Sequence, residues 1–254
     1  MDMAQIQNSF SWPHEHRAAV SLTFDDARPS QVDVGLPIMD RAGVKATFYV
    51  SPPRLDERPL DWRQAVARGH EMGNHTLTHP CSGNFPWSRH NALEDYTLEA
   101  MQRELDGANA VIHEKLGVTP STFAYPCGQT FVGRGEDARS YVPLVATRFT
   151  AGRGFRNESP NDPGYCDLAQ LAAVESDGLS AEGLRSWMER ALASSGWIVF
   201  AGHEVGNGGH QTVLADALQW LCEYCTEPAN GIWIATVHQV SAHIAAAQRA
   251  NRSH

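Results

Sequence analysis

The feature that most constrains the fold of this chain is a repeated alternation of short, β-prone apolar stretches with helical stretches. The β-prone stretches end in polar or turn-forming residues, and apolar residues between them recur at a helical period. Such alternation is typical of a parallel sheet whose strands are connected by helices. The pattern predicts about seven strands in one sheet, either closed as a barrel or doubly wound.

The elements can be placed approximately along the chain. Strands are expected at residues 18–24, 46–50, 122–124, 144–147, 197–201 and 232–236, with another entering the histidine-rich stretch after residue 69. Helices are expected at residues 34–42, 62–68, 93–116, 184–192 and 213–221. The segment 151–165 is rich in Gly, Pro, Asn and Arg and is predicted to be a long loop. No linker or internal repeat divides the chain, so one domain over residues 1–254 is expected, with its core at about 18–243.

Composition limits the classes of partner. The formal net charge of −9 argues against nucleic acid and anionic membranes as main partners. No apolar run approaches the length of about 18 residues that a membrane span needs. The first five residues lack the basic and apolar regions of a secretory signal, which predicts a cytoplasmic protein.

The five cysteines do not have the even count and regular spacing of a disulfide framework. Cys222 and Cys225 form a Cys-x-x-Cys pair, but they lie within an expected helix and no second pair accompanies them. Packing of that helix is therefore preferred to a zinc or redox role.

The stretch GHEMGNHTLTHP at residues 69–80 places His75 and His79 four residues apart. Two imidazoles at this spacing can bind one metal ion if a third ligand, usually a carboxylate, comes from elsewhere. With 12 histidines in the chain, the spacing alone could arise by chance. The setting supports a site, because Gly69, Gly73 and Pro80 indicate a short strand that ends in a loop.

Polar groups follow two further expected strands, with Asp25 and Asp26 after one and His203 after another. In a parallel barrel the carboxyl ends of all strands meet at one rim, where these groups can converge. Two imidazoles and one carboxylate leave coordination positions open, as in a catalytic metal centre. A closed site with Cys81 as fourth ligand is a less favoured alternative, and a solvated acidic turn is the alternative for the aspartate pair.

Several stretches together resemble the polysaccharide deacetylases, also called the NodB-homology domain or carbohydrate esterase family 4. They are TFDD at residues 23–26, ATFYV at 46–50, HTLTHP at 75–80, FAYPCG at 123–128 and VFAGH at 199–203. The likeness runs in order from about residue 20 to about residue 243. It implies an α/β fold, a distorted (β/α)7-type barrel of the NodB kind.

The resemblance also implies site roles. Asp26, His75 and His79 would bind one divalent metal ion, most commonly Zn²⁺, with Co²⁺ or Ni²⁺ as alternatives. Asp25 would be the general base, His203 the general acid, and the backbone N–H of Cys127 an oxyanion donor. These roles suit hydrolysis of an acyl group, since a metal polarises the carbonyl and activates water, while a histidine can protonate the leaving group.

The chain departs from the family pattern at Ala124, where relatives have an arginine that holds the catalytic aspartate. Arg148, Arg153 and Arg156 lie close enough in sequence for one of them to restore that charge. The acids available to orient His203 are Glu175 and Asp177.

The favoured function is removal of acetyl groups from N- or O-acetylated sugars. Hydrolysis of a small non-sugar amide, as in allantoinase-like members of the superfamily, is the first alternative. A carbohydrate-binding protein without catalysis is the second, prompted only by Ala124. Trp87, in a polar loop after His79, is a candidate for stacking on a sugar. The expected partner is thus an acetylated sugar or small amide, and the sequence does not indicate an oligomeric state.

Overall fold

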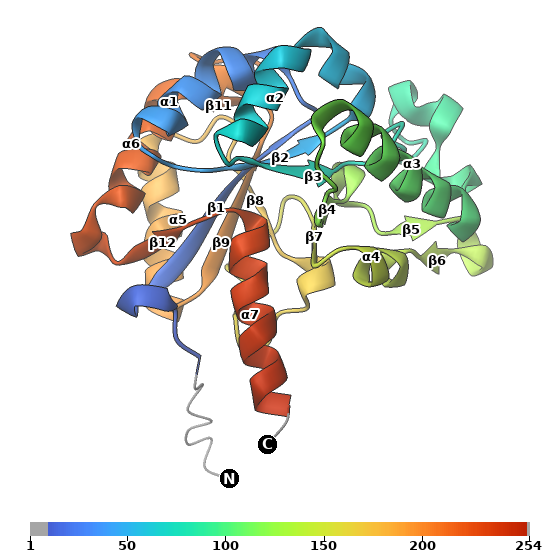
Figure 1. Ribbon diagram of the computed structural model, residues 1–254. Coiled ribbons are helices and arrows are strands. Elements are labelled where there is room, and N and C mark those ends of the chain that lie inside the picture. Colours follow the sequence, from blue (N-terminus) through green and yellow to red (C-terminus); the bar gives the residue numbers. More distant parts are fainter. Residues whose placement is uncertain (1–9, 253–254) are drawn as a thin grey trace.

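A curled parallel sheet forms the centre of the protein. The computed structural model describes residues 10–252 (Figure 1), so the first five residues, on which the cytoplasmic prediction rests, lie outside it. The strands of the sheet are β1 (Ala18–Asp25), β2 (Thr47–Val50), β3 (Glu71–Asn74), β4 (Thr122–Ala124), β7 (Ala151–Arg153), β8 (Val174–Glu175), β9 (Trp197–Gly202) and β12 (Ile232–Ile234). Seven of them follow the order β7-β4-β3-β2-β1-β9-β8, and β12 pairs with the first half of β1. This order confirms the distorted barrel of about seven strands.

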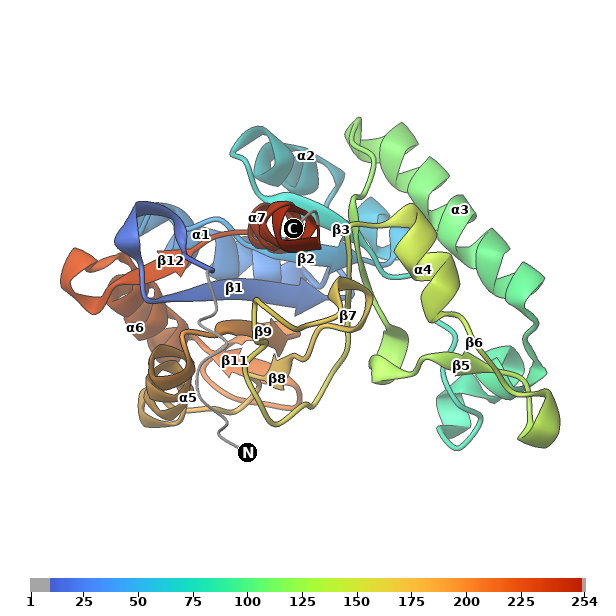
Figure 2. The same ribbon diagram turned by 90° about the horizontal axis from the view of Figure 1, so that it is seen from below.

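Seven α-helices surround the sheet in the described part of the chain (Figure 2). They are α1 (Leu36–Arg41), α2 (Pro59–Ala67), α3 (Leu98–Leu116), α4 (Val142–Arg148), α5 (Ala181–Ser194), α6 (Ala215–Thr226) and α7 (Val237–Arg252). Two small ribbons lie outside the main sheet, β5 (Phe131–Val132) with β6 (Arg139–Ser140) and β10 (Glu204–Gly206) with β11 (Thr212–Leu214). None of the described helices has the length and apolarity needed to cross a membrane.

The long strand β1 shows how the sheet separates two apolar layers. Its residues Val20, Leu22 and Phe24 pack into the outer core, which includes side chains of α1, α5 and α6. Ala19 points the other way, into an inner core that contains Trp197 and residues of α7. Because side chains alternate along a strand, Asp25 has the same orientation as Ala19 and faces the interior at the carboxyl end of β1.

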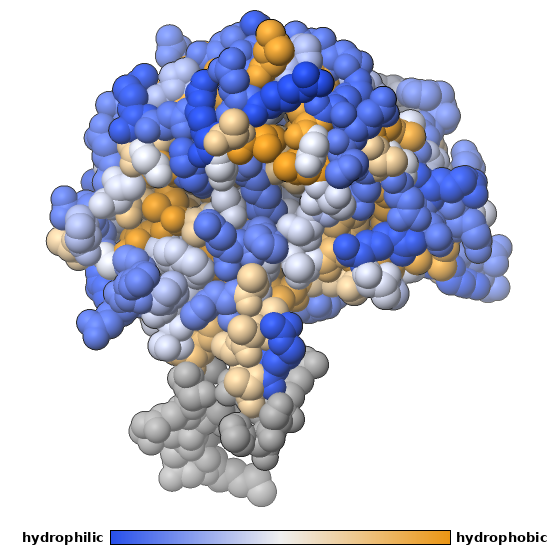
Figure 3. Space-filling model, in the orientation of Figure 1, coloured by the Kyte–Doolittle hydropathy of each residue, from blue (hydrophilic) through white to orange (hydrophobic). Residues whose placement is uncertain are grey.

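Helix α7 covers the open side of the curled sheet. Val237, Val240 and Ile244 on this helix belong to the inner core, together with Ala151 of β7. In Figure 1, α7 runs down the front of the molecule between β1 and β7. Hydrophilic side chains predominate on this face (Figure 3), in keeping with the net charge of −9.

Two sequence predictions about elements are wrong. Residues 144–147 were expected as a strand but belong to α4, in which Pro143 occupies the first turn and only Val145 is buried. The segment 151–165 was expected as a loop, but its first three residues form β7. Strand β7 reads Ala-Gly-Arg and has no β-branched or aromatic residue, and β8 has only two residues, so neither carries a strand signal in the sequence.

Candidate active site

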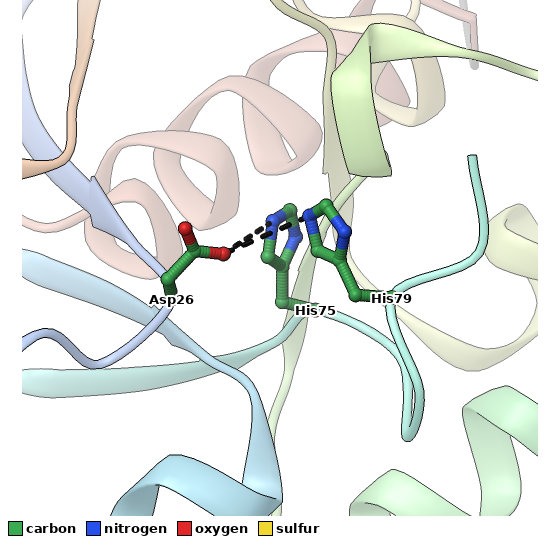
Figure 4. A group of neighbouring side chains, drawn as sticks. All are labelled: Asp26, His75 and His79. Carbon is green, nitrogen blue, oxygen red and sulfur yellow. Dashed lines mark ion pairs between the residues drawn. The ribbon is translucent and has the colours of Figure 1, made fainter. Parts of the chain in front are cut away.

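Asp26, His75 and His79 come together at the carboxyl ends of β1 and β3 (Figure 4). Asp26 directly follows β1, His75 directly follows β3, and His79 lies four residues further on in the loop. One potential ligand atom from each lies within 4.8 Å of the others. Oδ1 of Asp26 is 3.8 Å from Nε2 of His75 and 3.7 Å from Nε2 of His79.

The donor set fits a divalent metal ion. Nδ1 of His75 lies 2.9 Å from the carbonyl oxygen of Ala124 and must donate to it, which leaves the Nε2 lone pair facing Asp26. The oxygen-to-nitrogen separations exceed hydrogen-bond length and are close to the roughly 3.4 Å between two ligands on a tetrahedral zinc ion. Burial, and then the neighbouring His75, lower the pKa of His79 to about 4. Its imidazole is therefore neutral at neutral pH, as metal binding requires.

A buried carboxylate of α3 holds the loop that carries the two histidines. Oε2 of Glu104 accepts hydrogen bonds from the backbone N–H groups of Leu77 and Thr78, at 3.0 and 2.8 Å. Oε1 of the same residue accepts a bond of 2.8 Å from the Thr78 hydroxyl. Within the loop, Thr76 Oγ1 accepts from the N–H of His79, whose φ is 56°. Sequence reasoning missed Glu104, although a charged residue on the apolar face of an expected helix is a signal that could have found it.

Asp25 lies beside the three candidate ligands and is paired with a buried arginine. Oδ2 of Asp25 is 3.9 Å from Nε2 of His75, and Oδ1 accepts a hydrogen bond from Nη2 of Arg153. Burial opposes ionisation of Asp25, but the charge of Arg153, followed by those of His75 and His203, keeps the pKa below its ordinary value of 3.8. Asp25 is therefore a carboxylate at neutral pH, as a general base must be.

Arg153 supplies the positive charge beside Asp25 that Ala124, unlike the arginine of relatives at this position, cannot supply. Ala124 of β4 pairs directly with Arg153 of β7, so the guanidinium enters the interior from the neighbouring strand. Nη1 of Arg153 donates to the carbonyl oxygen of Gly154 at 2.9 Å, and the side chain is fully buried. Of the other two candidates, Arg148 pairs with Asp106, and Arg156 pairs with Glu175.

His203, which follows β9, is oriented by Asp177. Nδ1 of His203 lies 2.6 Å from Oδ2 of Asp177, and Oδ1 of Asp177 accepts a hydrogen bond of 3.0 Å from the His203 backbone. Burial lowers the pKa of His203, but the hydrogen bond with Asp177 and the charge of Asp25 outweigh it and raise the pKa above 6.5. Glu175, the other candidate, is engaged by Arg156 and has no hydrogen bond or ion pair with His203 in the described chain.

Two polar residues that the sequence did not reveal connect the strand ends. The Nε2 group of Gln31 donates to the backbone oxygens of Asp25 and His203, at 2.6 and 2.8 Å. Nη2 of Arg28 donates to Oδ2 of Asp26 at 2.9 Å, which is the oxygen that does not face the histidines. Burial opposes ionisation of Asp26, but His75, His79 and Arg28 together lower its pKa.

All six predicted site residues line one cavity of about 800 Å³. Cys127 lies in its wall with a left-handed backbone, φ 54°, on the turn after β4. Trp87 lies at the same cavity, 54% exposed, and stacks on Phe85 with ring centroids 5.4 Å apart. The Trp87 ring also lies 6.0 Å from the His79 ring, so the exposed aromatic pair borders the candidate metal site.

The remaining cysteines do not join the candidate metal site. Sγ of Cys81 lies 3.8 Å from Nδ1 of His79, which is the ring nitrogen on the side away from Asp26. Cys222 and Cys225 are buried in the outer core on α6, as expected for packing residues.

Comparison with known proteins agrees with this geometry. The sequence profile of the polysaccharide deacetylase family matches residues 14–140, which is half of the chain. The chain therefore belongs to the polysaccharide deacetylase family.

Two relatives that align with more than half of this chain share less than a third of their residues with it over the aligned part. The chain is 30% identical over 171 residues to a gellan lyase from a Bacillus species, covering 64% of this chain and 6% of that protein. It is 29% identical over 143 residues to chitin deacetylase 1 of Cryptococcus neoformans var. grubii, covering 56% of this chain and 28% of that protein. The chain thus spans less than a third of the length of either relative.

A solved structure from Mycobacterium smegmatis, described as a polysaccharide deacetylase, has the same fold. It superposes with a TM-score of 0.68 over 93% of both chains, at 17% sequence identity. At this identity the likeness concerns the fold alone.

Proposed function

We propose that the protein is a metal-dependent hydrolase that removes acetyl groups from N- or O-acetylated carbohydrate. The observation that carries the proposal is the convergence of three candidate ligands, a paired carboxylate and a paired histidine on one cavity. Family membership supports it. The proposed catalytic unit is a single domain with its core at about residues 18–243.

Asp26, His75 and His79 would hold one divalent ion, with Zn²⁺ favoured by two imidazoles and one carboxylate and Co²⁺ or Ni²⁺ as alternatives. When bound, the ion would supply Lewis-acid polarisation of the acyl carbonyl and a lower pKa for water. Arg28 and the Ala124 carbonyl would keep Asp26 and His75 in position through their hydrogen bonds.

Two residues at the ends of different strands, Asp25 and His203, carry out the proton transfers. Asp25, kept ionised by Arg153, accepts the proton of the attacking water. His203 holds its Nδ1 proton toward Asp177, so its Nε2 is the atom that donates to the departing amine or alkoxide. The backbone N–H of Cys127 at the cavity wall is the proposed donor to the oxyanion.

Acetate release tests this proposal. Purified protein loaded with Zn²⁺ is incubated with chitin oligomers, acetylated xylan and allantoin, with and without a chelator. Acetate from either sugar substrate that disappears with chelator and returns with metal is the expected result. Glycan binding without any acetate release would instead favour the non-catalytic alternative.

The deacetylases among the relatives are named for carbohydrates, so the allantoinase-like alternative is not favoured. Hydrolysis of allantoin in the same panel, with no acetate from either sugar, would reverse that preference.

A further inference from the structure

The mouth of the active-site cavity carries cationic side chains, although the protein as a whole is acidic. The chain has 29 acidic residues against 20 lysines and arginines. Apart from Asp25 and Asp26 at the centre, every ionisable side chain that lines the cavity other than Cys127 is an arginine or a histidine. An unpaired positive charge at the mouth of a cavity raises the local concentration of anionic ligands.

Three arginines line this cavity, and two of them are already neutralised. Arg28 pairs with Asp26 and Glu204, and Arg156 makes two hydrogen bonds to the carboxylate of Glu175. Arg54 is exposed in the turn after β2, and its guanidinium has no carboxylate or other acceptor among the described residues. It is therefore the one full positive charge at the described cavity that is available to a ligand.

Two exposed histidines line the same cavity. His90 follows Trp87 in the loop after the metal-binding stretch, and His210 lies in the turn between β10 and β11. Neither side chain is held by an ion pair within the described chain. Arg54, His90 and His210 thus reach the cavity from three separate segments of the chain.

We propose, building on the deacetylase function above, that Arg54 binds a carboxylate of the substrate, which is an acetylated carbohydrate that contains uronic acid residues. A guanidinium matches a carboxylate through two parallel hydrogen bonds. One unpaired arginine matches a single negative charge, whereas a phosphate carries a charge of about −1.5 to −2 and calls for more cationic partners. The stacked Phe85 and Trp87 in the same cavity provide an apolar surface for a sugar ring beside the charged contact.

The test compares two acetylated oligosaccharides that differ only in charge. One contains hexuronic acids, and the other is its counterpart with each carboxylate reduced to a primary alcohol, at the same degree of acetylation. The wild type is expected to have a kcat/KM about tenfold or more higher on the charged substrate, the magnitude of a hydrogen-bonded charged contact. The difference should lie mainly in KM and should shrink as salt rises.

Substitution of Arg54 separates this contact from general charge effects. In Arg54→Gln the ratio of kcat/KM between the two substrates should fall toward one, and Arg54→Lys should keep part of it. Arg41→Gln is the matched control, since Arg41 is an exposed arginine of α1 that does not line the cavity. An equal ratio in the wild type, or an unchanged ratio in Arg54→Gln, would overturn the carboxylate site while leaving the deacetylase function in place.

A binding measurement keeps the two proposals distinguishable. Calorimetry with the deacetylated uronic oligosaccharide should show a weaker affinity for Arg54→Gln than for the wild type and Arg41→Gln. If neither acetylated substrate releases acetate but this difference is found, the hydrolase proposal fails and the carboxylate site stands. If the uronic oligosaccharide binds all three proteins equally, the carboxylate site fails.

Discussion

At the scale of single residues, Ala124 stands on β4 where relatives have an arginine, and Arg153 on the neighbouring strand β7 supplies the positive charge instead. Ala124 cannot hold Asp25, and its ladder partner Arg153 contacts that carboxylate instead. The position of the guanidinium in the site is thus retained while its position in the sequence changes. Three arginines were equivalent candidates in the sequence, because the register of β4 against β7 decides which of them enters the interior.

Removal of Arg153 should affect both stability and pH dependence. Arg153→Gln leaves Asp25 as a buried charge without its partner, which should lower the free energy of unfolding by about 3–5 kcal/mol. The pKa of Asp25, now held below 3.8, should rise. A general base acts only when deprotonated, so the acidic limb of kcat/KM should move to higher pH.

Urea unfolding and a pH profile of kcat/KM measure these effects. Arg148→Gln is the control, since Arg148 pairs with Asp106 at the surface and its loss should cost less than about 1 kcal/mol. Arg153→Lys keeps the charge and should show a smaller change of both kinds. An acidic limb that stays in place in Arg153→Gln would contradict the proposed role.

Asp177 should set the alkaline limit of activity. A general acid acts while protonated, so activity falls as pH rises through its pKa, which for His203 lies above 6.5. Asp177→Asn removes the charge and weakens the hydrogen bond that raise this pKa. The alkaline limb should therefore move to lower pH by about 1 to 2 pH units.

The pH profile of Glu175→Gln provides the comparison. Glu175 was the second candidate to orient His203, but it contacts Arg156 instead. Its replacement should leave the alkaline limb where it is in the wild type. A displaced limb in Glu175→Gln, with none in Asp177→Asn, would reverse the assignment.

At the scale of elements, some strands of the sheet were predicted well from the sequence and others were missed. The strand expected at residues 18–24 is β1, and those at 122–124 and 197–201 are β4 and β9. They are buried on both faces because helices and the inner core cover them, and their mostly apolar, β-prone residues give a clear signal. Strands β7 and β8 gave no such signal, since β7 reads Ala-Gly-Arg without a β-branched or aromatic residue and β8 has only two residues.

The ends of helices were also predicted only approximately. The helix expected at 93–116 begins at Leu98, after Thr97 caps it by accepting a hydrogen bond from the N–H of Ala100. The apolar residues before that point lie in a separate turn, Leu93–Asp95. The predicted ligands and acids lie together because all of them are at or within a few residues of the carboxyl end of a strand. Glu104 and Gln31 act through tertiary contacts that a sequence pattern does not encode.

Helix α3 should contribute to metal affinity through Glu104. Glu104→Gln leaves one oxygen to serve the three donors of Leu77 and Thr78, so the loop that carries His79 should be held less firmly. Loss of a partner that orients ligands typically weakens metal binding by about 10–100-fold. Competition with a chromogenic zinc chelator measures the change. Glu114→Gln, an exposed residue of the same helix, should bind zinc as the wild type does.

At the scale of the whole molecule, the proposed ion joins parts of the chain that are far apart in sequence. Asp26 follows the central strand β1, whereas His75 and His79 follow β3 and are tied to α3. Oδ1 of Asp26 lies 3.8 and 3.7 Å from the Nε2 atoms of His75 and His79, so no direct hydrogen bond joins these parts of the chain. A ligand that binds the folded state alone must stabilise that state.

Zinc should therefore raise the melting temperature of the protein. At a free concentration of 100 times Kd, the ion should add about 2.7 kcal/mol to the free energy of unfolding. For a chain of this size that corresponds to about 5–11 °C in Tm. Scanning calorimetry with zinc, and again after chelation, measures the difference. In His79→Ala the site loses one of its three ligands, so the rise in Tm on adding zinc should fall to a small fraction of the wild-type rise. His113→Ala, on the exposed side of α3, is the control and should keep the full rise. An equal gain in wild type and His79→Ala would place the bound zinc elsewhere on the molecule, and the hydrolytic role of this cavity would then lose its basis.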